Sequence, residues 1–302
     1  MAAGQPFSVS LSGGLDKSTN SLSLLQTPGV ATKLRNFEVS IEGGYRRING
    51  YSVLGGGSAA RPNSSNDIEG LEVYADGVVA VAGNDIFFSL DGTDWLQINK
   101  ASVDASGDNY STFTGRSELS LTNLDQCEFA IYEGISEYGE LIITDKSGSN
   151  KPFLFKMTGT GALTNRTFFV SQITISGSTT AKHCTIHNNH LVVAGDTSTP
   201  NTLYYSSTGD IDSFTGSGAG SIVLEDKIVG LKSFRNELFI FCQNSLFKLQ
   251  NISNASTIQV VPVTKNVGCI DGQTIQEIAG DLIFLAPDGF RTVAGTARIG
   301  DV

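Results

Sequence analysis

This sequence has little proline and lacks any long hydrophobic run. Only 7 of its 302 residues are proline, whereas 34 are glycine. No run of about 18 apolar residues is present, so no transmembrane helix is predicted. The N-terminal stretch MAAGQPFSVSLSGG has neither a basic start nor an apolar segment. We therefore expect no signal peptide and synthesis in a cytoplasm.

Helical periodicity is also missing. No long stretch repeats its apolar residues three and four positions apart, while short apolar runs separated by Gly, Asn and Asp are frequent. Because 40% of the residues are hydrophobic, the chain has enough material for a core. These features predict an all-β protein with many turns, organised as one large domain or two small ones.

Positive charge is scarce. The chain has 20 Lys and Arg against 30 Asp and Glu, which gives a formal net charge of −10. As a whole, such a chain repels nucleic acids and anionic membranes. The few cysteines are scattered singly, without disulfide or zinc spacing, so we expect reduced core thiols at Cys127, Cys184, Cys242 and Cys269.

What the sequence does contain is a unit that recurs five times. In each copy a tight polar turn opens a short, very apolar strand, and a partner strand follows. The apolar strands begin at Val78, Leu141, Leu191, Leu238 and Leu282. Their partners begin at Ile86, Phe153, Leu203, Leu246 and Phe290. A period of roughly 40–50 residues built from short strands is typical of a β-propeller, with one sheet per blade.

The five apolar strands are continuous hydrophobic runs rather than alternating patterns. Strands that are buried on both faces have such runs, so we expect these to be the inner strands of the blades. In particular, we expect Leu238, Phe239, Ile240 and Phe241 to be buried. A β-sandwich or a β-solenoid with accidental spacing is the alternative interpretation.

Three regions are predicted along the chain. Residues 1–33 form an extended N-terminal arm, residues 34–66 a β-hairpin and linker, and residues 67–302 the β-propeller repeats. The arm has strand-like alternation but too little apolar surface for its own core. We expect it to add to a sheet edge, on its own propeller or on a neighbouring subunit. Its assembly residues would be Phe7, Val9, Leu11, Leu15, Leu22 and Leu24.

The hairpin is expected within residues 34–51, with Gly43 and Gly44 at its turn. Within the repeats, residues 101–118 are expected to be an inserted polar loop. Further strands would complete the blades, and Pro262 suits an edge position in one of them. These outer strands are predicted near residues 167–175, 221–224 and 257–264.

All three histidines lie close together in the sequence. On a strand, His183 and His187 share a face but lie about 13 Å apart, which is too far to share one ion. We therefore interpret the histidines as structural, with His187 packed in the core and His190 in a turn in solvent. A metal site is the alternative.

Two partner strands run into related turns, FFSLDGTDW (87–95) and YYSSTGDIDSF (204–214). They resemble the Asp-box turn of many propellers without keeping its full spacing. In such a turn the carboxylate caps backbone N–H groups and the aromatic ring packs beneath. We expect structural roles for Asp91 and Asp212, with catalysis as the alternative. Because P-loop, HExxH and GxSxG motifs are missing, we expect no enzyme activity and no cofactor.

The segment from residue 13 to residue 51 resembles the opening of tail proteins from tailed bacteriophages, specifically the nozzle-type β-propellers of short-tailed phages. The matching positions are Gly13, Gly14, Leu15, Pro28, Ala31, Leu34, Asn36, Gly43, Arg46, Arg47, Gly50 and Tyr51. The last repeat, residues 267–293, is similar to later blades of that family.

This resemblance implies a structural component of a virion tail, a nozzle or tail-tip ring that forms part of the DNA exit channel and assembles in the host cytoplasm. The implied partners are other copies of the chain in a ring, expected to be a hexamer, and tail adaptor or tail-tube proteins. DNA would pass without specific binding, and no membrane anchor is implied. Two other hypotheses stay open: a propeller that binds or cleaves host-surface glycans, and a generic intracellular propeller scaffold.

Overall fold

The computed structural model describes residues 15–16, 30–31, 33, 35, 37–39, 45–48, 62, 66–98, 109–111, 121–122, 124–134, 136–177 and 180–299. The chain divides into two compact units, Met1–Val53 and Leu54–Val302. Strands dominate the described part of both. Helix is confined there to two single 3-10 turns, η1 (Leu163–Asn165) and η2 (Gly272–Thr274), and to α3 (Val293–Ile299). No helix in these described ranges is long and apolar enough to cross a membrane.

In the smaller unit, β1 (Phe37–Val39) pairs with β2 (Tyr45–Arg47) in an antiparallel hairpin. Val39 lies opposite Tyr45, as expected of a hairpin within residues 34–51. The two glycines proposed for its turn lie outside the described residues.

Of the proposed arm residues, only Leu15 belongs to the described part of the chain. It forms a parallel bridge with Ala31, and the Asp16 N–H donates to the Ala31 carbonyl at 3.0 Å. The Leu15 side chain is 45% exposed. The other five, which lie outside the described ranges, stay predictions: Phe7, Val9, Leu11, Leu22 and Leu24.

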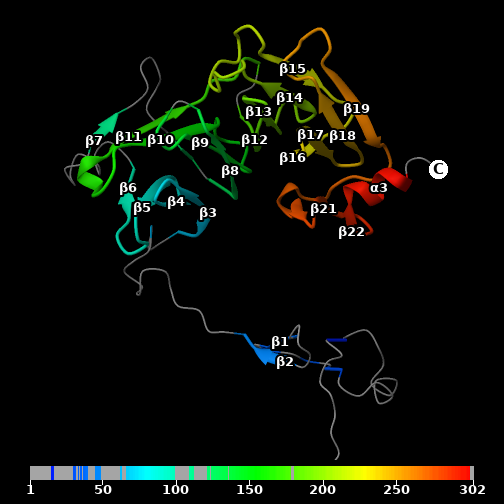
Figure 1. Cartoon of the computed structure of the whole chain (residues 1–302), viewed down its shortest axis with the longest axis horizontal. Helices are drawn as coiled ribbons and strands as arrows, with labels where there is room; N and C mark the ends of the chain where they lie inside the picture. The colour runs from blue at the N-terminus through cyan, green and yellow to red at the C-terminus, as the bar shows by residue number, and fades with distance from the viewer. Residues whose placement is uncertain are drawn as a thin grey trace, which may run out of the picture. The chain divides into compact units, whose positions relative to one another are not determined.

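The described residues of the larger unit form five sheets that follow one another along the chain (Figure 1). The first comprises β3 (Ile68–Tyr74), β4 (Gly77–Ala82), β5 (Asp85–Ser89) and β6 (Leu96–Gln97). The second comprises β7 (Asn109–Ser111), β8 (Cys127–Tyr132), β9 (Glu140–Asp145), β10 (Phe153–Thr158) and β11 (Thr167–Gln172). The third comprises β12 (His183–His187), β13 (His190–Ala194), β14 (Thr202–Tyr205) and β15 (Gly220–Val223).

The fourth sheet comprises β16 (Ile228–Phe234), β17 (Glu237–Cys242), β18 (Leu246–Gln250) and β19 (Gln259–Thr264). The fifth comprises β20 (Gln276–Ile278), β21 (Asp281–Ala286) and β22 (Gly289–Thr292). Each sheet is one of the five repeats, so the all-β, β-propeller-like fold is confirmed. The predicted apolar strands are β4, β9, β13, β17 and β21, and their predicted partners are β5, β10, β14, β18 and β22.

The position of the apolar strands within the sheets differs from the expectation. They are the second strands, and the innermost strand of each sheet is the one before. The first strands β3, β8, β12 and β16 pack on one another in that order, and residues from all five sheets line a common central cavity of about 290 Å³. Second strands are hydrogen-bonded along both edges, and those of the three interior sheets, β9, β13 and β17, are also covered on both faces. That position explains the continuous apolar runs of these three strands.

The core lies between consecutive sheets. In the first interface the Tyr74 ring meets Phe155 at 5.3 Å between centroids, and in the last Phe241 meets Phe284 at the same distance. The predicted burial of β17 is confirmed, since Leu238, Phe239, Ile240 and Phe241 are 0–7% exposed. Each interior sheet therefore contributes apolar side chains from both of its faces.

A charged clamp ties the second sheet to the first. Arg166, which is 1% exposed, donates two hydrogen bonds to the Asp76 carboxylate at 2.7 and 2.6 Å. Its guanidinium also donates to the Gly161 carbonyl at 2.7 Å. This bidentate ion pair holds the β3–β4 turn against the segment before β11.

Two details outside the core bear on the sequence expectations. Within the stretch expected to be an inserted loop, residues 109–111 form β7, which pairs in parallel with β11. A strand of three residues has too little periodicity to be recognised in a polar segment. Pro262 lies on β19, at the edge of the fourth sheet as predicted.

Candidate functional site

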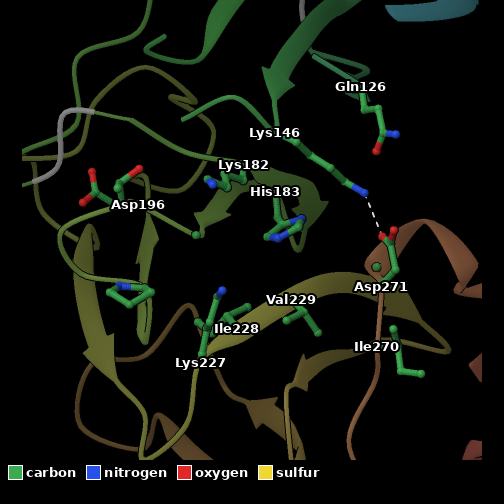
Figure 2. Close-up of a pocket in the computed structure, with 14 residues that line it drawn as sticks. Gln126, Lys146, Lys182, His183, Asp196, Lys227, Ile228, Val229, Ile270 and Asp271 are labelled. Atoms are coloured by element: carbon green, nitrogen blue, oxygen red, sulfur yellow. Dashed lines mark hydrogen bonds and ion pairs between the residues drawn. The ribbon is translucent and has the colours of Figure 1, made fainter. Parts of the chain in front are cut away.

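A cavity of about 420 Å³ opens at the end of the sheets where the first strands begin (Figure 2). Four sheets contribute to its lining. Lys146 follows β9, Lys182 directly precedes β12, and Lys227 directly precedes β16. His183 of β12 and Asp271, just before η2, lie beside them. Three lysines therefore line one cavity in a chain with a net charge of −10.

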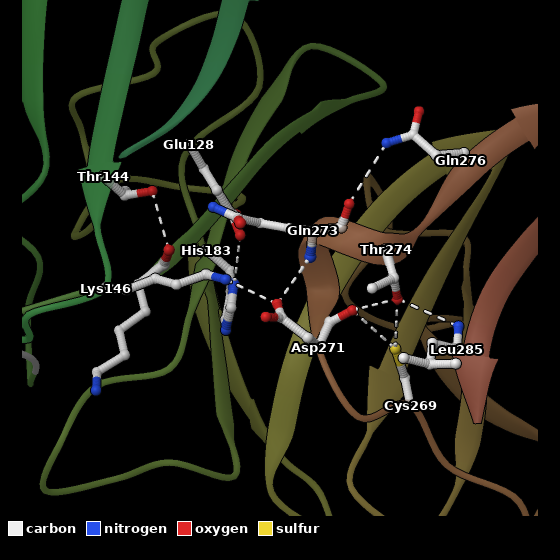
Figure 3. Close-up of polar contacts among 11 residues, drawn as sticks. Glu128, Thr144, Lys146, His183, Cys269, Asp271, Gln273, Thr274, Gln276 and Leu285 are labelled. Atoms are coloured by element: carbon white, nitrogen blue, oxygen red, sulfur yellow. Dashed lines mark hydrogen bonds and ion pairs between the residues drawn. The ribbon is translucent and has the colours of Figure 1, made fainter. Parts of the chain in front are cut away.

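Lys146 is held by a carboxylate from the fifth sheet (Figure 3). Its Nζ lies 2.7 Å from Asp271 Oδ1, which also accepts the Gln273 N–H at 3.0 Å. Burial opposes ionisation of Asp271, but the bonds from Lys146 and Gln273 lower its pKa below the ordinary value. The charge of Lys146 is thus already compensated within the cavity wall.

His183 is oriented by an acidic partner. Its Nδ1 lies 3.0 Å from Glu128 Oε1, across the interface between the second and third sheets. Its other ring edge faces Gly195, where an added Cβ would lie 2.9 Å from His183 Cδ2. Gly195 also has a positive φ of 84°. A side chain at 195 would therefore displace the ring and strain the loop.

Hydrogen bonds fix the backbones of Lys182 and Lys227, but no described carboxylate pairs with their ammonium groups. The Lys182 N–H donates to the Ala194 carbonyl at 2.9 Å, and its own carbonyl accepts from Thr144 Oγ1 at 3.2 Å. The Lys227 N–H donates to Asp226 Oδ1 at 2.8 Å. In the part of the chain that the structure describes, neither ammonium has a carboxylate partner.

The remaining carboxylate of the cavity, Asp196, is occupied by its own loop. It is 2% exposed and accepts N–H groups from Thr180, Ser198 and Thr199 at 3.0, 2.7 and 3.0 Å. These bonds shape the loop after β13 and use both carboxylate oxygens. Asp196 therefore shapes the wall of the cavity, whose lining has three lysines against the two carboxylates of Asp196 and Asp271.

The central cavity between the first strands has a more acidic lining than the cavity at the ends of these strands. Glu72 and Glu128 line it together with Lys232 and the glutamines of the fifth sheet. Burial raises the pKa of Glu72, and its bond with the Val73 backbone partly opposes that shift. The wall between the sheets is thus more acidic than the opening at the end of the strands.

The histidines expected to be structural make specific bonds. His187 Nδ1 lies 2.8 Å from Ser233 Oγ, and burial lowers its pKa. The expectation that His190 lies in solvent is wrong, because it is 0% exposed. His190 begins β13 rather than ending the turn, and its Nδ1 lies 2.6 Å from the Ser206 carbonyl. In the described ranges no group of three His, Cys, Asp or Glu is arranged to hold a metal ion.

The first Asp-box-like turn forms as expected. Asp91 Oδ1 accepts the Thr93 N–H at 2.8 Å, and the Ser89 hydroxyl accepts the Gly92 N–H at 2.8 Å. Trp95 packs against the first sheet and donates its indole N–H to the Gly92 carbonyl at 3.2 Å. In the second turn Phe214 is buried in the core. The expected capping role of Asp91 is therefore seen directly.

All four cysteines are free and buried, as predicted. Burial raises the pKa of the Cys184 and Cys242 thiols to about 12. A thiol with such a pKa stays protonated near neutral pH and reacts slowly.

The outer face of the first sheet carries exposed apolar side chains. Ile68, Leu71 and Val73 lie opposite Ala82, Ala80 and Val78, so they share one face of the sheet. They are 51%, 53% and 67% exposed. On the opposite face, which packs on the second sheet, Tyr74 is 1% exposed.

The fifth sheet repeats this asymmetry. Leu285 lies opposite Phe290, and Ile278 lies opposite Asp281 on the same face. Phe290 and Ile278 are 72% and 57% exposed. Leu282 and Phe284 point to the other face and are fully buried against the fourth sheet. The described part of the fifth sheet thus leaves one apolar face exposed. On the first sheet only the β3 part of the face is exposed, since Ala80, Ala82 and Phe87 on the same face are 0–6% exposed and Trp95 packs against them.

No family model matches the chain, and no curated protein matches it. Among solved structures, it is similar to the extracellular domain of BT4673 from B. thetaiotaomicron, with a TM-score of 0.42 and 13% identity over 75% of this chain and 27% of that one. It is also similar to the AfRom2 CNH domain, with a TM-score of 0.43 and 12% identity over 78% of this chain and 70% of that one.

A third similar structure is the N-terminal domain of Nup159, with a TM-score of 0.40 and 8% identity over 75% of this chain and 60% of that one. The chain therefore spans only part of these proteins. Such similarities are too low to transfer a function, so the functional argument depends on this chain's own residues.

Proposed function

We propose that this chain is a structural component of a bacteriophage virion tail, a nozzle or tail-tip ring that forms part of the DNA exit channel. The observation that carries the proposal is the set of exposed apolar side chains on β3 of the first sheet and on the outer face of the fifth sheet. Contiguous exposed apolar surface of this kind marks an interaction site. An assembly of several chains would cover it.

Two further features support this function. The N-terminal segment resembles the opening of phage tail proteins, at positions that include Gly13, Leu15 and Gly50. The net charge of −10 suits a wall that DNA passes without adhering, because release of counterions favours binding only to basic surfaces. Neither feature depends on the other, since one is a residue pattern and the other a composition.

The same apolar faces favour a second candidate, a propeller scaffold that assembles with other cellular proteins. The two functions differ in where the chain is found. A scaffold remains in cell extracts, whereas a tail component co-purifies with particles in a fixed ratio to the other virion proteins.

Electron microscopy of purified particles tests the proposal. A chain carrying a C-terminal affinity tag would be labelled with gold against that tag. We expect gold at the tail tip of each particle and about as many copies per particle as a closed ring contains. Particles that carry no label, with the tagged chain recovered from cell extract in complexes of other composition, would contradict it.

A further inference from the structure

The cavity at the ends of the first strands concentrates positive charge. Lys146, Lys182 and Lys227 come from three different sheets and line one cavity (Figure 2). Three lysines against the aspartates Asp196 and Asp271 leave the lining with a formal positive charge. An anion bound beside the lysines would offset that charge.

The lysines do not contribute equally. Lys146 already has Asp271 at 2.7 Å, and Asp196 is saturated by backbone donors. Lys182 and Lys227 are left with three N–H donors each and no carboxylate partner in the described ranges. In Figure 2 both side chains lie to the left of His183, with Lys182 above Lys227, and they are the groups that an incoming anion would meet.

We propose that this cavity binds a small phosphate-bearing molecule, with its phosphate between Lys182 and Lys227. A tetrahedral oxyanion has enough acceptor oxygens for both ammonium groups, and charge-assisted bonds of this type are the strong ones. The cavity volume of about 420 Å³ is in the range of small-molecule sites. This role is independent of the proposed place in a virion.

A small anion fits the site better than nucleic acid does. The wall below the opening carries Glu72 and Glu128, and the whole chain has a net charge of −10. A long polyanion would be repelled by that surface beyond the two lysines. A compact phosphate contacts the lysines alone.

Isothermal titration calorimetry with inorganic pyrophosphate tests the site on the full chain at constant ionic strength. We expect binding at one site, and a loss of affinity of at least about tenfold in the double variant Lys182→Gln/Lys227→Gln. The matched control is Lys248→Gln/Lys265→Gln, which removes the same charge from lysines paired to Glu237 and Glu225. This control should bind pyrophosphate as the wild type does.

A third variant separates charge from folding. Lys182→Arg/Lys227→Arg keeps both charges and should retain most of the affinity, and pyrophosphate should raise the unfolding midpoint of this variant and the wild type. Absence of binding to the wild type, or equal losses in the double variant and its control, would overturn the proposal. So would binding of duplex DNA through these lysines without binding of pyrophosphate.

Discussion

Phe284 and Phe290 are in adjacent strands of the same sheet and have opposite surroundings. Phe284 is fully buried against Phe241 of the fourth sheet, whereas Phe290 is 72% exposed on the other face. The first sheet shows the same contrast between Tyr74 and Val73. In both sheets, the face that packs on the neighbouring sheet is buried, and large apolar side chains are exposed on the other face.

The difference shows how the repeats obtain their stability. A repeat of this kind cannot bury its apolar face alone, and stacking of neighbours produces a continuous core. The three interior sheets have a neighbour on each side, and the first and fifth have one. The exposed apolar side chains of the first and fifth sheets are therefore a consequence of the repeat pattern, and they are what the proposed assembly would use.

The largest expected effect is at Phe284, the buried residue of this comparison. Phe284→Ala should lower the free energy of unfolding by about 3–5 kcal/mol, because it leaves a cavity in the interface with the fourth sheet. Phe241→Ala, on the facing strand, should cost a similar amount. Denaturant unfolding monitored by circular dichroism measures both. A loss below about 1 kcal/mol would mean that this interface is not central to the fold.

A smaller effect is expected at the clamp between the first two sheets. Asp76→Asn removes the charge that compensates the buried Arg166 guanidinium. Because the Asp76 side chain is 50% exposed, water replaces part of the interaction, and we expect a loss of about 1–2 kcal/mol. Asp67→Asn, at an exposed position before β3, is the matched control and should be neutral. Equal losses in the two variants would contradict the clamp.

The clamp also predicts a dependence on pH. The hydrogen bond from Arg166 lowers the pKa of Asp76 below its ordinary value of 3.8. The stabilisation by the Asp76–Arg166 pair is therefore fully present above pH 3.8. It is lost as the pH falls through the lower pKa that Asp76 has in the folded state. Wild type and Asp76→Asn should differ in unfolding free energy near neutral pH and converge as the pH falls below 3.8. A difference that stays constant into that range would show that ionisation of Asp76 is not involved.

The smallest effect is expected at Phe290, the exposed residue of the comparison. Phe290→Ala makes the same chemical change as Phe284→Ala, yet it should alter the unfolding free energy of the isolated chain by less than about 0.5 kcal/mol. In the assembled state we expect a larger loss, because the proposed neighbour covers this side chain. Yield of assembled particles at equal chain concentration provides the readout. An unchanged yield would remove Phe290 from the interface.

The sequence was sufficient to predict the repeats, since five apolar strands such as the one at Leu238 recur in phase with their turns. It was not sufficient to predict the order of strands within a sheet. First strands such as β3 and β20 mix exposed apolar and polar residues, because one edge faces the central cavity. Such a pattern is not distinguishable from that of an outer strand without knowledge of the neighbouring sheets.

The basic cavity was also missed, although the chain contains a signal for it. In the second, third and fourth sheets, the residue directly before the innermost strand lines this cavity. These residues are Gln126, Lys182 and Lys227, so equivalent positions of three repeats carry polar or basic side chains. Aligning the repeats on their first strands would have brought these residues together. His190 was misplaced for a related reason, because the strand starts one residue earlier than the apolar run.

Cysteine labelling at exposed apolar positions of the first and fifth sheets tests the central claim most directly. Val73→Cys and Phe290→Cys introduce accessible thiols, while the four native cysteines are buried. A maleimide reagent should label both variants rapidly in the free chain and much more slowly in assembled particles. Lys265→Cys, at a position 58% exposed after β19, serves as the reference for reagent access in both states. Equal labelling rates for Val73→Cys and Phe290→Cys in the free and assembled states would contradict the account.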